Sequence, residues 1–145
     1  MTITKTVKAE ATLLEAFKIE VKARHHAIII DQGESSGGKD QGMNPLEVQL
    51  GAVAACICTI GRIVAKQQRI ELRGMICTVE AGLNTQVLMG KHHDERAGFQ
   101  GMTLHVSIDA DMTQAEKEAF VHEVDSRCPV SESLANPTPL TFIVD

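Results

Sequence analysis

The sequence predicts an α+β protein, in which strands follow one another along the chain and are not alternated with helices. The expected order is three strands, one long helix, two strands, a second helix and a final strand, whereas a doubly wound sheet would alternate the two kinds of element. The composition is typical of a globular protein, because 43% of the 145 residues are apolar and 23% are charged. A chain of this length is expected to form a single domain, residues 1–145, around one core.

The first strands are predicted from alternation of polar and apolar residues. Residues 2–9 (TITKTVKA) and 16–23 (AFKIEVKA) alternate with period two, which is typical of half-buried strands. Residues 26–31 (HAIIID) form a β-branched run and predict a third strand. The fifteen residues 31–45 (DQGESSGGKDQGMNP) are rich in Gly, Ser, Asp, Asn and Pro and predict a surface loop.

A long helix is predicted from Pro45 to about Gln68. Asn44 is a favourable N-cap, Pro45 suits the first helical position, and Glu47 places a negative charge in the first turn. The segment is apolar on nearly every side, which indicates a helix surrounded by protein.

The second half of the chain predicts a hairpin, a helix and a closing strand. Residues 71–83 and 99–109 are expected to pair as long strands on either side of a polar tip. The sequence TQAE at 113–116 is a capping box, so a helix is expected to begin there and to end at Cys128, the residue before a proline. A short turn and a strand over residues 140–144 (LTFIV) would complete the fold.

Charge and composition argue against several classes of protein. A net charge of -5 and the lack of Tyr and Trp disfavour nucleic-acid binding. The longest apolar run, residues 51–61, is shorter than a membrane span, and the N-terminal residues lack the apolar region of a secretory signal. The expected location is the cytoplasm, without a membrane or nucleic-acid partner, where cysteines are kept reduced.

Four cysteines carry the chemistry that the sequence suggests. Cys56 and Cys58 lie two residues apart on the predicted helix, about 200° around its axis, so they are not expected to bridge each other or to share a metal. Cys77 alternates with apolar residues of a strand and suits a core position. Cys128 follows a helix end and precedes PVS, where a thiol can face a cleft.

Metal binding is disfavoured by spacing. No C-x₂-C or H-x₃-H pattern occurs, and adjacent histidines such as His92 and His93 would point to opposite faces of a strand. No metal or other cofactor is therefore expected. A cysteine–histidine dyad using His105 or His122 stays open as an alternative, although no sequence feature places either near Cys56.

Two motifs together resemble the OsmC/Ohr family of osmotically induced and organic hydroperoxide resistance proteins. The first is NPLEVQLGAVAACICTIGRIVA, in which Cys56 follows Asn44 by twelve positions, and the second is CPVSESL, which begins at Cys128. The resemblance covers the whole chain and implies an intertwined homodimer with two long central helices wrapped by mainly antiparallel sheets. It also implies a thiol peroxidase: Cys56 would attack the peroxide and become a sulfenic acid. Cys128 would then condense with it to a Cys56–Cys128 disulfide, which an external dithiol of lipoyl type would reduce.

The resemblance also suggests two supporting residues. In the hydroperoxide resistance branch a glutamate directly after Asn-Pro holds an arginine from the first strands, and that arginine stabilises the thiolate. Here Leu46 follows Pro45, the acid is Glu47, and the nearest arginine is Arg24 in KARHHAIIID. These features are closer to the OsmC-like branch, and Glu47 and Arg24 are the candidates for the two roles.

Two further interpretations stay open at the level of sequence. The same fold, with the same cysteines, could sense oxidants or electrophiles, or bind small molecules, without turnover. Alternatively, the cysteines could be core residues with no chemistry.

Overall fold

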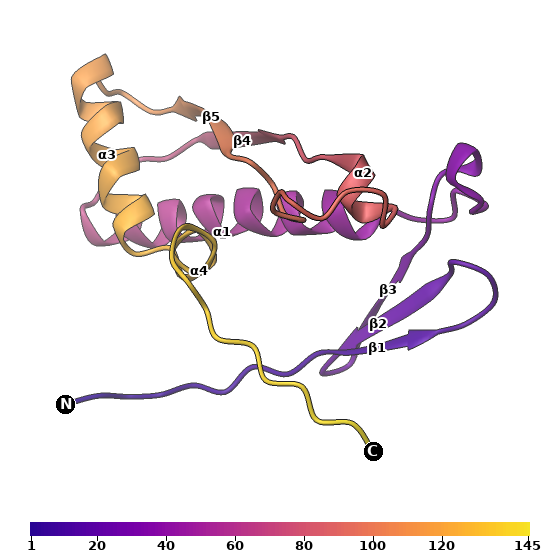
Figure 1. Ribbon diagram of the computed structural model, residues 1–145. Coiled ribbons are helices and arrows are strands. Elements are labelled where there is room, and N and C mark those ends of the chain that lie inside the picture. Colours follow the sequence, from indigo (N-terminus) through magenta and orange to yellow (C-terminus); the bar gives the residue numbers. More distant parts are fainter. The chain divides into compact units, whose positions relative to one another are not determined.

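The computed structural model describes residues 1–145 and confirms the α+β class (Figure 1). Its elements in chain order are β1 Glu10–Leu13, β2 Ile19–Ala23, β3 His26–Ile30, the 3₁₀ helix η1 Glu34–Ser36, α1 Pro45–Gln67, β4 Gly74–Ala81, α2 Thr85–Leu88, β5 Met102–Asp109, α3 Gln114–Ser126 and α4 Pro129–Ala135. The chain forms two compact units, Met1–Gln49 and Leu50–Asp145. The expectation of a single domain stays a prediction.

The first unit is built on an antiparallel sheet in the order β1-β2-β3. Strands β2 and β3 are joined by a tight turn at Arg24 and His25, and Arg24 adopts a left-handed conformation with a φ of 56°. The strand expected over residues 2–9 is not formed, and pairing begins at Glu10. Ile3 and Val7 are 86% and 81% exposed, because the chain supplies no neighbouring strand on which an apolar face could pack.

The loop after β3 is organised by the buried carboxylate of Asp31. Its side chain accepts hydrogen bonds from the backbone N–H groups of Gln32, Lys39 and Gln41, at 2.8, 3.2 and 3.2 Å. Burial favours the protonated carboxyl, but these three donors and the charge of Lys18 prevail and lower the pKa of Asp31. The Asp31 carboxylate therefore holds together a loop whose regular structure is the short 3₁₀ helix η1.

Helix α1 begins as its sequence predicts. Asn44 and Glu47 form a capping box, in which each side chain accepts a hydrogen bond from the other residue's backbone N–H, at 2.9 and 2.8 Å. The helix is 23 residues long, and its most apolar 18-residue window has a mean hydropathy of 1.8 with 28% of its residues buried. By length and composition alone it could cross a membrane, a test that the core helix of a soluble protein also passes.

The second unit packs α1 against the β4–β5 hairpin and α3 (Figure 1). The hairpin is antiparallel from the Gly74–Asp109 pair to the Ala81–Met102 pair, as expected but with shorter strands. The buried core joins α1, β5, α3 and the segments beside them, through Ile57, Val64, Ala65, Leu72, Ile108, Ala110, Phe120, Val124 and Cys128. Met75 and Cys77 of β4 and Val130 of α4 are partly buried and pack against it.

Two expectations for the C-terminal part are wrong. Helix α3 ends at Ser126, and the segment expected to be a turn after Cys128 is the helix α4. Pro129 ends α3 but is also a favourable first residue for α4. Residues 140–144 form no strand, and Phe142 is 84% exposed, because no strand of this chain lies beside them.

Candidate active site

Cys56 lies near the middle of α1, on the flank of the helix that packs against the core. Its neighbours Val53 and Ile57 are fully buried, whereas Cys56 is half-buried and contacts the core cluster that contains Cys128. Cys58 lies further around the helix, as its spacing predicts. The helix thus fixes Cys56 at the border between the core and the surface.

Cys128 occupies the junction between α3 and α4 and is only 1% exposed. It is the N-cap of α4, and its Sγ accepts a hydrogen bond from the backbone N–H of Ser131 at 3.4 Å. The hydroxyl of Ser131 donates to the Asp125 carboxylate at 2.7 Å, which ties the start of α4 to the end of α3. The position of the Cys128 sulfur is therefore fixed by contacts that involve both α3 and α4.

Cys56 packs against the core cluster that contains Cys128, and each thiol changes the acidity of the other. Burial raises the pKa of Cys56, and the Cys128 thiol beside it raises it further, although the backbone N–H of Val130 acts in the opposite direction. Burial also opposes ionisation of Cys128, but the Ser131 N–H, the Cys56 thiol, the Ser131 hydroxyl and the Val130 N–H together lower its pKa. Of this pair, Cys128 is the more acidic thiol.

The other two cysteines, Cys58 and Cys77, lie on α1 and β4. Cys77 is half-buried on the core-facing side of β4, as expected, and burial raises its pKa, with further contributions from the thiols of Cys58 and Cys128. The Cys58 thiol donates a long hydrogen bond to the Met75 carbonyl at 3.9 Å. All four cysteines are free, so no disulfide is present.

No cationic side chain acts on Cys56. Arg62, on the same helix, donates to the Leu72 carbonyl at 2.8 Å. Arg127, beside Cys128, donates to Gln67 at 2.9 Å and lies 3.4 Å from the Glu123 carboxylate. The second unit therefore holds the two thiols together without a positive charge between them.

The two candidate supporting residues belong to the first unit. The Glu47 carboxylate accepts the Asn44 N–H, so it caps α1. Arg24 is exposed in the β2–β3 turn and makes no ion pair or side-chain hydrogen bond in the chain. The structure shows the local environment of each, and their roles in thiol chemistry stay predictions.

The histidines do not come together in a metal-binding or catalytic site. His105 lies on the exposed face of β5, 3.9 Å from Glu80, and His92 lies 3.6 Å from Glu95. No group of three or more His, Cys, Asp or Glu side chains is arranged to hold a metal ion. His122 is exposed on α3, and neither His105 nor His122 is among the groups that shift the pKa of Cys56, so the structure does not support the alternative dyad with Cys56.

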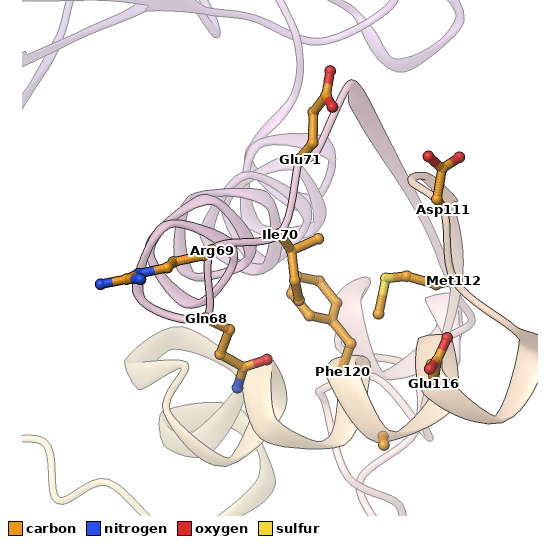
Figure 2. Close-up of a pocket in the computed structure, with 9 residues that line it drawn as sticks. Gln68, Arg69, Ile70, Glu71, Asp111, Met112, Glu116 and Phe120 are labelled. Atoms are coloured by element: carbon orange, nitrogen blue, oxygen red, sulfur yellow. The ribbon is translucent and has the colours of Figure 1, made fainter.

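A cavity of about 630 Å³ lies away from the thiols, where the connection after α1 faces α3 (Figure 2). Its floor is apolar, with Ile70, Met112 and Phe120, and its rim carries charged residues that include Glu71 and Arg69. Sequence reasoning did not anticipate this cavity. It contains none of the four cysteines, so the thiol pair, and not this cavity, is the candidate active site.

Ser131 and Asp125 were also missed from sequence. The signal was present in CPVS, because a serine three residues after an N-cap residue can place its N–H on the capping atom. Cysteine is not among the residues expected to cap a helix, so the sequence does not predict this cap.

Comparison with known proteins identifies one protein family that this chain matches. The family model described as OsmC-like protein matches residues 38–142. A comparison with curated protein sequences gives no match. An OsmC-like protein from Mycoplasma pneumoniae superposes with a TM-score of 0.80 at 21% identity, covering 93% of this chain and 91% of that one.

Two further solved structures have the same fold. The organic hydroperoxide resistance protein OsmC from Legionella pneumophila gives a TM-score of 0.68 at 25% identity, with 92% of this chain and 91% of that chain covered. The organic hydroperoxide resistance protein OhrB of Bacillus subtilis gives 0.62 at 21% identity, with 92% and 93% covered. These likenesses confirm the fold that the two cysteine motifs suggested.

Proposed function

The chain belongs to the OsmC-like family, and on that premise we propose that it is a thiol-dependent peroxidase that reduces organic hydroperoxides with Cys56 and Cys128. The observation that carries this proposal is that Cys56 packs against the core cluster of the second unit that contains Cys128, where each thiol shifts the pKa of the other. Cys56 and Cys128 are 72 positions apart in the sequence, so their proximity does not follow from chain spacing. A reaction that forms a disulfide between them requires this proximity.

The proposed reaction has three steps. The Cys56 thiolate attacks one peroxide oxygen, the O–O bond breaks, and the alkoxide leaves with a proton as the alcohol, so that Cys56 becomes a sulfenic acid. The Cys128 thiolate then attacks the Cys56 sulfur, an S–S bond forms, and hydroxide leaves. An external dithiol, of lipoyl type in this proposal, reduces the disulfide by exchange and is itself oxidised. No metal or other cofactor takes part.

The proposal includes a homodimer. Ala52, Ala55, Thr59 and Ile63 recur at three- and four-residue intervals on α1 and are exposed. An apolar helix face of this length is normally covered, and a second copy of the chain would cover it as the family resemblance implies. Within such a dimer, Arg24 and Glu47 would support the thiolate of Cys56. The proposed setting is the cytoplasm, where a dithiol reductant is available.

Replacing each cysteine by serine tests the proposal. The Cys56→Ser variant should consume no peroxide, because a hydroxyl of far higher pKa does not attack the O–O bond. The Cys128→Ser variant should consume about one peroxide per subunit, leave a sulfenic acid on Cys56, and then stop or over-oxidise. Mass spectrometry after one equivalent of an organic hydroperoxide, with a dimedone-type probe for sulfenic acid, distinguishes the two.

The matched control is Cys77→Ser, which removes a thiol of the same core but leaves the reacting pair intact. It should retain turnover with a dithiol. An unmodified Cys56 in the Cys128→Ser protein would contradict the peroxidase proposal, and equal loss of stability without a trapped sulfenic acid would favour a structural role.

One observation favours a second candidate function. Because burial and the Cys128 thiol raise the pKa of Cys56, its thiolate is scarce at neutral pH in the second unit, which favours a slow, single oxidation over rapid turnover. Repeated turnover with dihydrolipoamide distinguishes the peroxidase from the sensor, which would stall after a single oxidation.

A further inference from the structure

We propose that the cavity between the connection after α1 and the start of α3 is a second binding site, which takes a small organic cation with a short apolar body and a protonated amine (Figure 2). It lies in the second unit, contains none of the four cysteines and is independent of the proposed peroxidase reaction. Its volume of about 630 Å³ is within the range of about 300–1,000 Å³ that small-molecule sites occupy.

One wall of the cavity is formed where α1 ends. The N–H of Ile70 donates to the Ala65 carbonyl at 2.8 Å, and the N–H of Arg69 donates to the Lys66 carbonyl at 3.4 Å, which together form a Schellman motif. Arg69 occupies the left-handed position of this motif, with a φ of 57°. The turn leaves Ile70 packed against the core, whereas the Arg69 side chain points away from the apolar floor (Figure 2). The backbone of the helix end therefore fixes this wall without a ligand.

The floor of the cavity is apolar and belongs to the core of the second unit. Phe120 is 4% exposed, and the half-buried side chains of Ile70 and Met112 pack against the cluster that contains it. Ala119, exposed on α3, completes the lining beside Phe120. An apolar body that covers this floor removes apolar surface from water, which favours binding. Because core packing already holds these side chains, little ordering is needed when a ligand binds.

The rim of the cavity carries more negative than positive charge. Glu71, Asp111 and Glu116 contribute three carboxylates, and Arg69 contributes the one guanidinium of the lining. Arg73, outside the lining, pairs with Asp111 at 3.1 Å and so offsets one of these carboxylates. The carboxylates of Glu71 and Glu116 remain, and the Arg69 side chain is turned away from the floor. An apolar cavity with this rim is complementary to a cation.

The two remaining carboxylates have oxygens that are available to a ligand. Glu71 is exposed and makes no ion pair or side-chain hydrogen bond within the chain. One oxygen of Glu116 accepts the Thr113 N–H at 2.7 Å in the capping box, and its other oxygen has no partner in the chain. A protonated amine has three N–H donors and forms charge-assisted hydrogen bonds with carboxylates. An apolar molecule that ends in such an amine matches both the floor and the rim, whereas an anion would meet like charge.

Three probes of similar shape and different charge test the proposal. They are 4-phenylbutylamine, which is a cation at pH 7, the neutral 4-phenylbutanol and the anionic 4-phenylbutanoate. Binding to the full chain is followed by NMR of the methionine methyl groups, because Met112 lines the cavity and Met75 does not. A Met112→Leu variant assigns the Met112 signal.

The three probes should bind in the order of their charge. The amine should shift the Met112 methyl signal and bind about three- to tenfold more tightly than the alcohol, the fold-change expected from one or two exposed ion pairs. The anionic probe should bind most weakly, and the Met75 signal should stay in place with all three. Raising the ionic strength should remove most of the difference between the amine and the alcohol, because salt screens exposed charges.

Variants of the rim and of the floor test the two parts of the site. Glu71→Gln should weaken binding of the amine about two- to fivefold and leave binding of the alcohol unchanged. The matched control Glu118→Gln removes the same charge from α3 outside the cavity and should change neither. Ala119→Phe places a ring in the cavity and should abolish binding of both probes. His122→Phe, also exposed on α3 but outside the lining, should not.

Thermal unfolding of each variant shows whether its fold is intact, and Glu71→Gln with its control decides the question if Ala119→Phe does not fold. Equal affinities for the amine and the alcohol at low salt would overturn the assignment of a cationic ligand. A Met112 signal that no probe moves would exclude the site, and an equal response of Glu71→Gln and Glu118→Gln would remove the role of the Glu71 carboxylate. None of these measurements requires turnover of a peroxide, so a failure of the proposed function would leave this site in place.

Discussion

Replacement of Gly61 by alanine tests how closely α1 and β4 approach. A Cβ added at Gly61 would lie 2.6 Å from the sulfur of Met75 and 3.1 Å from its terminal carbon. Alanine should stabilise the helix itself by about 1 kcal/mol. Displacing Met75 in a packed core should cost roughly 1–3 kcal/mol. The second effect is larger, so we expect a net destabilisation of about 1 kcal/mol.

Urea unfolding at a fixed protein concentration measures this change. With a slope of about 2 kcal/mol per molar, the midpoint should fall by roughly 0.5 M. In a Met75→Ala background the clash is absent, and the same Gly61→Ala change should raise the midpoint instead. Gly51→Ala is the control, because a Cβ at Gly51 meets nothing within 4 Å and only the gain in helix propensity remains. A Gly61→Ala change that is stabilising in both backgrounds would refute the close approach.

The remaining predictions concern assembly, activation and acid stability. Sedimentation should show a dimer across the micromolar range, and a monomer that persists at every concentration would contradict the role given to α1. Arg24→Ala should lower the alkylation rate of Cys56 at pH 6 several-fold, whereas Lys22→Ala should not; an unchanged rate would exclude Arg24 as the supporting cation. The folded pKa of Asp31 is lowered, so its contribution to stability is complete above its unfolded pKa of about 3.9 and is lost as the pH falls through the folded value. Asp31→Asn should therefore destabilise the protein at pH 7 and flatten its acid unfolding, whereas Asp40→Asn, in the same loop, should do neither.

Local sequence signals predicted the elements that stabilise themselves. The N-cap at Asn44 and the capping box at Thr113 predicted where α1 and α3 begin, and the long strands expected over 71–83 and 99–109 form the β4–β5 hairpin. Strands were also expected at 2–9, from alternation, and at 140–144, but a strand exists only beside a partner, and one copy of the chain supplies none. From the sequence pattern alone, a strand whose partner strand is absent cannot be distinguished from a segment that is wrongly assigned as a strand.

The active site was predictable only in part. The resemblance singled out Cys56 and Cys128, and the structure places Cys56 against the core cluster that contains Cys128. Which thiol is the more acidic depends on the direction of single N–H groups at the start of α4, a helix that was expected to be a turn. Because that helix was missed, Ser131 and Asp125 had no place in the sequence argument.

The unpaired run at residues 140–144 has a consequence for handling the protein. LTFIV is uncharged, rich in β-forming residues and exposed, a composition that promotes cross-β aggregation when such a segment is free. Pro137, Pro139 and Asp145 flank it as gatekeepers, since prolines and charges resist the growth of a sheet. Replacing these three flanking residues should therefore increase aggregation of the protein, without changing any contact of its folded core.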